Sequence, residues 1–306
     1  MRSVRFGLWL GIIGLVGCDG IQKVAQDGPL SCHSDDDCAA QPMQKACHAG
    51  FCADPGCPLG TAYVGAGPYS RGCDPIDPDC ELGAQPLHTV TIDHGFCVSV
   101  TELQVQQYRQ CVAAGACTKA PDLRCTQDLA TWTESPGANE ALPLTCLLWS
   151  EADAACRFLG GRLPTEAEWE KAARGRDARK YPWGNVQPLG CGSAVNYDGG
   201  GSCPGRPWSA SSASRQGAQL FSAARAVDMA GNVWEWVTDY YSPLAYRDCA
   251  TGCIDPLGPL SGTLRSRRGG GFQSSQWKEL TTFWRDFHTP ESARSDSQGA
   301  RCIFPK

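Results

Sequence analysis

The sequence predicts an α+β protein in which short helices and short strands are separated by long loops. Residues 165–175 carry the start and stop signals of a short helix, whereas residues 233–237 alternate in the manner of a strand. The chain also has 35 glycines and 21 prolines, and residues 176–227 are rich in Gly, Ser and Pro without clear periodicity. Such a composition favours short elements joined by irregular segments.

The composition sets limits on size, compartment and partners. With 306 residues the chain is long enough for one large domain and a small appendage. Nineteen cysteines in a chain of this size indicate an oxidising compartment. The formal net charge is −5 and no basic cluster occurs. We therefore expect no nucleic-acid partner, because nucleic-acid binding requires a clustered positive surface.

The N-terminal segment has the features of an export signal. Two arginines accompany an apolar stretch of eleven residues, which is too short to span a bilayer. The stretch is followed by Cys18 in a match to the bacterial lipobox, in which the cysteine is lipidated. We expect residues 1–17 to be a lipoprotein signal peptide, residues 18–31 a tether, and the protein to be lipid-anchored in the bacterial cell envelope. An ordinary cleaved signal with an incidental Cys18 is the alternative.

Residues 32–57 are expected to form a small cysteine-rich module. The segment has few large apolar side chains, so it needs cross-links to fold. His33 and His48 raise zinc as an alternative, but export and the even number of cysteines left without Cys18 favour disulfides. The connectivity stays open. The cysteines of the module are Cys32, Cys38, Cys47, Cys52 and Cys57.

The main domain is expected over residues 58–306. Strand-like runs occur within residues 61–66 and residues 87–96, separated by a Gly/Pro/Asp loop. Farther along, Cys111 and Cys117 are spaced to close a small loop.

Two helices are predicted in the first half of this domain. Thr101 and Gln104 match a capping box, which predicts a helix over residues 102–113. Ser150 is the expected N-cap of a second helix over residues 151–159, which ends at two glycines.

A third helix is predicted after Thr165. Thr165 and Glu168 form a capping box, which satisfies two backbone donors at the start of the helix. Glu170 and Arg174 are spaced to pair along one face, and Gly175 is the expected C-terminal cap.

The run from Asp228 to Asp239 is rich in aromatic and polar residues. Alternation places Trp234 and Trp236 on one face of a strand and Glu235 on the other. Three oxygen-bearing side chains, those of Asp228, Asn232 and Glu235, occur within eight residues and suit a hard cation such as calcium.

Five motifs in fixed order give the chain a family resemblance. GGRLPTEAEWEKAARG, YPWGN, DMAGNVWEW, RRGGGF and GARC occur in sequence between residues 160 and 302. Together they resemble the formylglycine-generating enzyme family, also called the sulfatase-modifying factor family, over residues 58–306. The resemblance implies an α+β fold that is a variant of the C-type lectin fold with little regular secondary structure.

The resemblance also shows where this chain departs from the family. The related enzymes bind copper(I) through two cysteines after the Gly-Gly-x-aromatic motif. The corresponding positions here are Ser274 and Glu279, and no cysteine occurs between Cys253 and Cys302. A hydroxyl and a carboxylate are poor ligands for this soft ion. We therefore expect neither copper nor formylglycine-generating activity.

Other site residues are implied by the resemblance. Arg285 corresponds to an arginine near the substrate cleft, with a surface or buried salt bridge as the alternative. A disulfide is implied between Cys156 and Cys302. A calcium site is implied at the following residues: Asp228, Gly231, Val233 and Glu235.

The sequence leaves two functional readings. In the first, the domain binds an unidentified peptide, glycan or protein ligand without redox chemistry. In the second, the chain is an active oxidoreductase of the formylglycine-generating or non-haem iron kind that uses other metal ligands. Iron would require a carboxylate together with histidines such as His88, His94 or His288.

Overall fold

The computed structural model describes most of the chain after residue 55. The described residues are 46–48, 51–53, 56–118, 125, 130–176, 178–187, 207, 225–288 and 294–306. The predicted signal peptide, Cys18 and the tether lie outside them. None of the helices in these ranges is long and apolar enough to cross a membrane.

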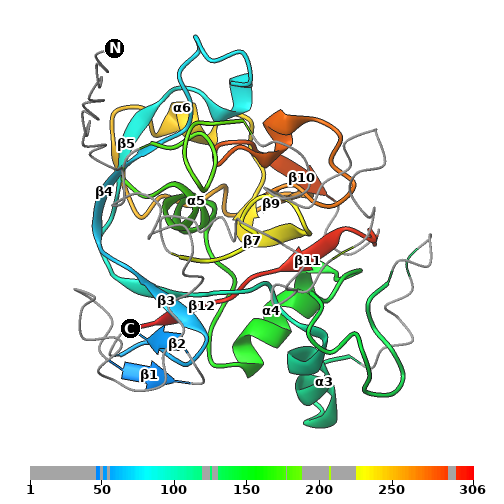
Figure 1. Cartoon of the computed structure of the whole chain (residues 1–306). Coiled ribbons are helices and arrows are strands. Elements are labelled where there is room, and N and C mark those ends of the chain that lie inside the picture. Colours follow the sequence, from blue (N-terminus) through cyan, green and yellow to red (C-terminus); the bar gives the residue numbers. More distant parts are fainter. Residues whose placement is uncertain are drawn as a thin grey trace, which may run out of the picture.

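The largest sheet has four strands in the order β10-β9-β7-β11 (Figure 1). The central strand β7 (Trp234–Tyr240) is antiparallel to β9 (Arg265–Arg268) and parallel to β11 (Gln298–Ala300). Strand β10 (Asp286–His288) pairs with the outer side of β9.

Two three-stranded sheets complete the main domain. One has the order β12-β6-β3 and is antiparallel. The other has the order β4-β5-β8, in which β5 is antiparallel to β4 and parallel to β8. The strands are β3 (Thr61–Val64), β4 (Gly67–Arg71), β5 (His88–Ile92), β6 (Phe96–Ser99), β8 (Cys253–Ile254) and β12 (Ile303–Pro305). A separate hairpin joins β1 (Ala46–His48) to β2 (Phe51–Ala53).

The single strand-like run predicted for residues 87–96 is divided in the structure. Strand β5 ends at Ile92 and β6 begins at Phe96, and these strands belong to different sheets. The turn between them contains Asp93 and His94, which are both exposed. Polar residues at the change of sheet thus reach the protein surface.

Helix α5 (Glu166–Arg174) lies near the centre of the domain, between the β4–β5 pair and the β7–β9 pair (Figure 1). The predicted capping box is confirmed. The Glu168 amide donates to Thr165 Oγ1 at 3.1 Å, and the Thr165 amide donates to Glu168 Oε2 at 2.8 Å. Gly175 follows with a φ of 66°, a backbone conformation that glycine adopts without strain. Every residue of the helix is buried, so it is a core element.

The two earlier helices begin at other residues than the sequence predicted. Helix α3 (Val105–Ala113) has Gln104 as its N-cap rather than Thr101, because the Gln107 side chain accepts from the Gln104 amide at 2.9 Å. Helix α4 (Trp149–Phe158) has Leu148 as its N-cap, and Ser150 lies inside its first turn. Its capping carboxylate is Glu151, which accepts from the Leu148 amide at 3.0 Å. The remaining helical segments are η1 (Leu82–Ala84), α6 (Ala245–Asp248) and η4 (Trp277–Leu280).

Strand β7 separates two hydrophobic clusters. Trp236 packs in a cluster with residues of α3 and α4, whereas Val237 packs in a second cluster with residues of α5. Glu235 points toward the α5 side and accepts from Trp169 Nε1 at 2.6 Å. The alternation predicted for this strand is therefore confirmed.

Twelve cysteines of the described residues form six disulfides. Cys156 of α4 is bonded to Cys302 beside β12, as the resemblance implied. Cys57, which the sequence assigned to the N-terminal module, is bonded to Cys97 of β6 and is thus tied to the main domain. The remaining pairs are Cys73–Cys80, Cys111–Cys117, Cys125–Cys146 and Cys249–Cys253.

Candidate functional site

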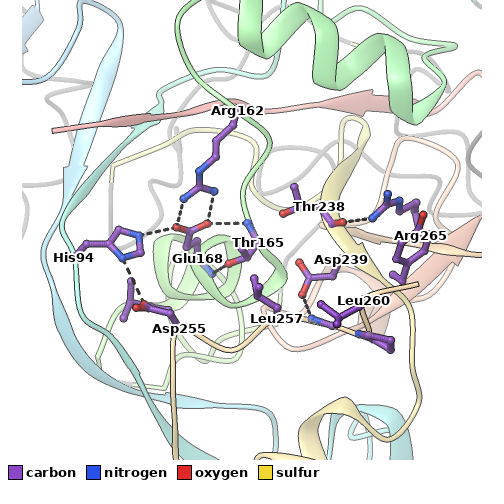
Figure 2. A pocket seen from close by; sticks show the side chains of 14 residues that line it. His94, Arg162, Thr165, Glu168, Thr238, Asp239, Asp255, Leu257, Leu260 and Arg265 are labelled. Carbon is purple, nitrogen blue, oxygen red and sulfur yellow. Dashed lines mark hydrogen bonds and ion pairs between the residues drawn. The ribbon is translucent and has the colours of Figure 1, made fainter. Parts of the chain in front are cut away.

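A pocket of about 620 Å³ opens at the N-terminal end of α5 (Figure 2). Its walls come from the residues that lead into α5 and its first turn, the last residues of β7, the turn after β5, the loop 255–260 and Arg265 of β9. The pocket is therefore assembled from segments that are distant in sequence.

Glu168 lies on one wall, and Arg162 and His94 hold its carboxylate in addition to the helix cap. Arg162 forms a bidentate ion pair with it, with Nη1–Oε2 and Nη2–Oε1 distances of 2.8 and 2.6 Å. His94 Nε2 is 2.9 Å from Glu168 Oε1. Burial alone would raise the pKa of Glu168, but the hydrogen bonds and charge of Arg162 outweigh it and hold the pKa below its usual range.

His94 connects this buried carboxylate to Asp93 and to Asp255, of which Asp255 also lines the pocket. Its Nδ1 atom is 3.2 Å from Asp93 Oδ1 and 3.5 Å from Asp255 Oδ1. Asp255 follows β8, and its carboxylate also accepts from the Asp93 amide at 3.1 Å. Partial burial lowers the pKa of His94, but the hydrogen bonds to Glu168 and Asp93 outweigh this effect and raise it.

Asp239 lies at the floor of the pocket and joins α5 to the 255–260 loop. Its carboxylate accepts from the Glu166 amide at 2.8 Å and from the Gly258 amide at 2.7 Å. Burial raises the pKa of Asp239 to about 6, and the negative charge of Glu166 adds to the effect.

The opposite wall combines an arginine with apolar side chains. The Arg265 guanidinium lies over the ring of Tyr240, 3.5 Å from its centroid, and donates to the Thr238 carbonyl. Leu257 and Leu260 form the lip, and Leu260 is 95% exposed. An apolar lip above charged walls is suited to a ligand that has both an apolar and a polar part.

The positions that the resemblance gives for the family's copper ligands, Ser274 and Glu279, lie elsewhere, in the segment from the end of β9 through η4. Ser274 is 4% exposed, and its Oγ accepts from the Gly271 amide at 3.1 Å. The turn depends on Gly270, which has a φ of 74° and a backbone so close to Leu280 that a Cβ would lie 2.6 Å from that side chain. Ser274 therefore stabilises a turn, and Glu279 is a half-buried carboxylate on η4.

Arg285 lies in the protein interior. Its Nε and Nη2 atoms donate to the two Glu166 carboxylate oxygens at 2.7 and 2.9 Å, and Nη1 donates to two backbone carbonyls. With these partners the guanidinium is part of a buried ion pair. The structure thus favours the salt-bridge alternative over a contact with substrate.

The residues of the implied calcium site do not present Glu235 to a cation. Its carboxylate accepts from Arg301 Nε at 2.9 and 3.2 Å, and its Oε1 atom is 2.8 Å from Arg301 Nη2. Trp169 donates to Oε2. Asp228, Gly231 and Val233 are buried in the segment before β7. Calcium at this place stays a prediction, and it would have to share Glu235 with Arg301.

The three histidines of residues 58–306 have different surroundings. His88 Nδ1 is 2.7 Å from the Pro86 carbonyl, and the His288 ring packs edge-on against Trp236. Among the described residues, no group of three potential ligands contains two histidines. The histidine triad considered for non-haem iron is therefore not formed there.

Sequence reasoning did not find the pocket. It identified Thr165 and Glu168 only as a helix cap, and it assigned no role to Asp239 or Arg265. The capping motif was the one available signal, because the other walls are brought together only by folding.

The fold and the pocket next to α5 describe an α+β domain with short elements and long loops. Comparisons with known proteins identify its family. Residues 57–305 match the model of the sulfatase-modifying factor enzyme 1-like domain, and the chain belongs to this family. It is 35% identical over 192 residues to a formylglycine-generating enzyme of Streptomyces coelicolor. That match covers 56% of this chain and 58% of the relative, so the chain matches little more than half of the relative's length.

Solved structures confirm the fold. The chain is similar to PvdO from Pseudomonas aeruginosa, with a TM-score of 0.58 and 19% identity over 83% of this chain and 95% of that one. It is also similar to Treponema denticola variable protein 1, with a TM-score of 0.60 and 20% identity over 80% of this chain and 95% of that one. At this level of identity the likeness concerns the fold alone.

Proposed function

We propose that this chain is a sulfatase-modifying-factor-like binding module that does not generate formylglycine. The proposal depends on one observation: no cysteine occurs between Cys253 and Cys302, and Ser274 and Glu279 occupy the positions that the family resemblance gives for the copper-binding cysteines. Copper(I) prefers soft thiolate ligands, and neither a turn-forming hydroxyl nor a carboxylate supplies them.

Other cysteines are poor substitutes for the missing pair. Twelve cysteines in the described part of the chain, from Cys57 onward, are each bonded to another cysteine. A disulfide sulfur cannot act as a thiolate ligand or nucleophile. The residues present therefore do not fit copper, and we derive no redox step for them.

We propose that the ligand of the module binds in the pocket beside α5. The exposed Leu257 and Leu260 supply apolar contact area, and Arg265 and the Arg162–Glu168 pair supply polar partners. A peptide with an apolar side chain next to a charged group has matching chemistry. The mixture of apolar area and a few oriented polar groups is typical of specific ligand sites.

The enzymatic alternative is tested with a peptide that contains C-x-P-x-R. The purified full chain is incubated with this peptide and copper(I) under oxygen, and the peptide mass is measured. We expect the cysteine to remain a thiol. Conversion of the thiol to an aldehyde would contradict the proposal.

A matched variant makes a negative result informative. Ser274→Cys/Glu279→Cys restores two thiols at the family positions, and Ser275→Cys/Glu279→Cys places one of them a residue away. We expect the first variant to bind copper(I) more tightly than the second and than the unchanged chain. Equal copper binding by the unchanged chain and Ser274→Cys/Glu279→Cys would contradict the assignment of these positions.

We also propose that the module is exported and held at a membrane by lipid on Cys18. The supporting observation is the short apolar stretch followed by the lipobox match. Cys18→Ala should move the protein from the membrane fraction to the soluble fraction, as measured by fractionation and immunoblotting. Retention of the substituted protein in the membrane fraction would contradict lipid anchoring.

A further inference from the structure

Three potential metal ligands converge at the rim of the pocket. They come from the turn after β5 and from the residue after β8, and they are Asp93, His94 and Asp255. One ligand atom of each lies within 4.8 Å of the others. Strands β5 and β8 are parallel neighbours, and the Asp255 amide donates to the Thr91 carbonyl at 2.8 Å. The backbone thus holds these two segments together independently of the side chains.

We propose that Asp93, His94 and Asp255 form a binding site for a divalent cation of the zinc class. This site is separate from Asp239 at the floor of the pocket. The proposal does not depend on which ligand the pocket binds. One imidazole nitrogen and two carboxylate oxygens are ligands that zinc accepts in proteins.

The spacing of the ligand atoms suits a tetrahedral ion. In such a site, with bonds of about 2.0–2.1 Å, two ligand atoms are about 3.3–3.4 Å apart. His94 Nδ1 is 3.2 Å from Asp93 Oδ1 and 3.5 Å from Asp255 Oδ1. The ligand atoms of the two aspartates lie within 4.8 Å of each other, so a single ion would draw these two oxygens together.

The partner of the other imidazole nitrogen orients His94 for this role. Nε2 lies 2.9 Å from the Glu168 carboxylate. Because this carboxylate is ionised in its pair with Arg162, it accepts a hydrogen bond and cannot donate one. A neutral His94 therefore carries its proton on Nε2 and directs the Nδ1 lone pair at the two aspartates. Histidines that ligate metals commonly donate their second N–H to a carboxylate in this way. Figure 2 shows His94 between Glu168 and Asp255.

The Nδ1 lone pair of His94 and the carboxylates of Asp93 and Asp255 repel one another unless a positive charge lies between them. A proton on Nδ1 can supply this charge, and a divalent cation can neutralise both carboxylates at once. His94 and Asp255 also line the pocket, so a fourth coordination position would face it. Three protein ligands with one open position are the arrangement of zinc sites that accept a further ligand.

The test is calorimetric titration of the metal-stripped full chain with Zn²⁺ alone. We expect the unchanged chain to bind one more zinc ion than His94→Ala. Asp255→Asn should retain the ion with an affinity lowered by more than about 10-fold, because it loses one charged ligand. Asp248→Asn is the matched control, since it removes an exposed carboxylate from α6 outside the cluster, and it should bind zinc like the unchanged chain.

Two further measurements keep the result interpretable. Zinc should raise the melting temperature of the unchanged chain but not that of His94→Ala, whose melting temperature without metal shows whether it is folded. Cobalt(II) should give the intense visible absorption of a tetrahedral complex, and His94→Ala should lose it. Equal zinc binding by the unchanged chain and His94→Ala would overturn the proposal, since the ion would then belong to other residues such as the N-terminal cysteines. A weak, six-coordinate cobalt spectrum would overturn the tetrahedral assignment.

Discussion

Helix α5 directs its glutamates to two different environments. Glu166 and Glu170 point into the core, where Arg268 contacts both at 3.0 and 2.9 Å and is 0% exposed. Glu168 points to the pocket, where its partner Arg162 is 41% exposed. The same residue type on the same helix thus stabilises the interior on one side and orients a solvent-facing cluster on the other. The face of the helix, rather than the local motif, decides the role.

On the buried side, four arginines pair with Glu166 and Glu170: Arg71, Arg174, Arg268 and Arg285. Burial alone would raise the pKa of Glu166, but the charges of Arg285 and Arg268 outweigh it and lower the pKa to about 2. Tyr246 donates to Glu170 Oε2 at 2.5 Å and accepts from Arg268 at 3.1 Å. A buried network of this kind adds little net stability, but the loss of one member leaves the others as uncompensated charges.

A large difference is expected between two single variants, each of which removes one arginine on a different side of α5. Arg268→Ala should lower the free energy of unfolding by about 3–5 kcal/mol, because Glu166 and Glu170 would lose a buried countercharge. Arg162→Ala should lower it by at most about 1 kcal/mol, since its ion pair is partly solvated. Urea denaturation followed by fluorescence measures both. Equal losses would show that the two sides of α5 do not differ as the structure indicates.

The disulfides permit a second comparison between the core and the pocket side. Cys156–Cys302 closes a sequence separation of 146 residues, whereas Cys249–Cys253, next to the pocket loop, closes one of 4. Loop entropy predicts a stabilisation of about 5 kcal/mol for the first and about 2 kcal/mol for the second. Thermal unfolding of the two double alanine variants should rank them in this order. A larger loss for the short loop would contradict the entropic explanation.

The pH dependence should report on Asp239, which lies between the two sides. Its pKa is raised from 3.8 to about 6, so between these pH values the folded state holds a proton that the unfolded chain has released. Stability from this group therefore falls as pH rises from about 4 to 6, by at most about 3 kcal/mol.

Asp239→Asn isolates this contribution from that of the other carboxylates. The variant should not show the fall in stability between about pH 4 and 6. Its unfolding free energy relative to the unchanged chain should therefore increase as the pH rises through this range. The measurement is the difference in unfolding free energy at several pH values, and the slope counts rather than the absolute level. A difference that is constant with pH would show that Asp239 is ionised throughout.

The smallest effect is expected at the helix cap. Thr165→Ala removes the acceptor for the Glu168 amide and should cost about 1 kcal/mol. Thr165→Ser retains the hydroxyl and should cost much less. If Thr165→Ala also weakens zinc binding, the cap contributes to the orientation of Glu168. An unchanged zinc affinity would show that the cap is not needed to orient Glu168.

Local sequence signals predicted α5 better than the other two helices. At α5 the capping residues Thr165 and Glu168 are also the residues that tertiary contacts hold in place, so local and global preferences agree. At α3 and α4 the predicted caps Thr101 and Ser150 have the right side chains. The structure instead uses Gln104 with Gln107 and Leu148 with Glu151, because packing against the core sets where each helix begins.

The sequence by itself determined the family, the α+β class, the strand alternation around Trp236 and the lack of thiols at Ser274 and Glu279. These properties depend on residue identity and local spacing, which the chain displays directly. Only the tertiary structure decided that Arg285 pairs with Glu166 in the interior and that Glu235 pairs with Arg301. The reason is that the role of a charged side chain depends on the partner that folding places next to it. The pocket and the Asp93–His94–Asp255 cluster are tertiary as well, since their residues meet only when distant segments become neighbours in the folded domain.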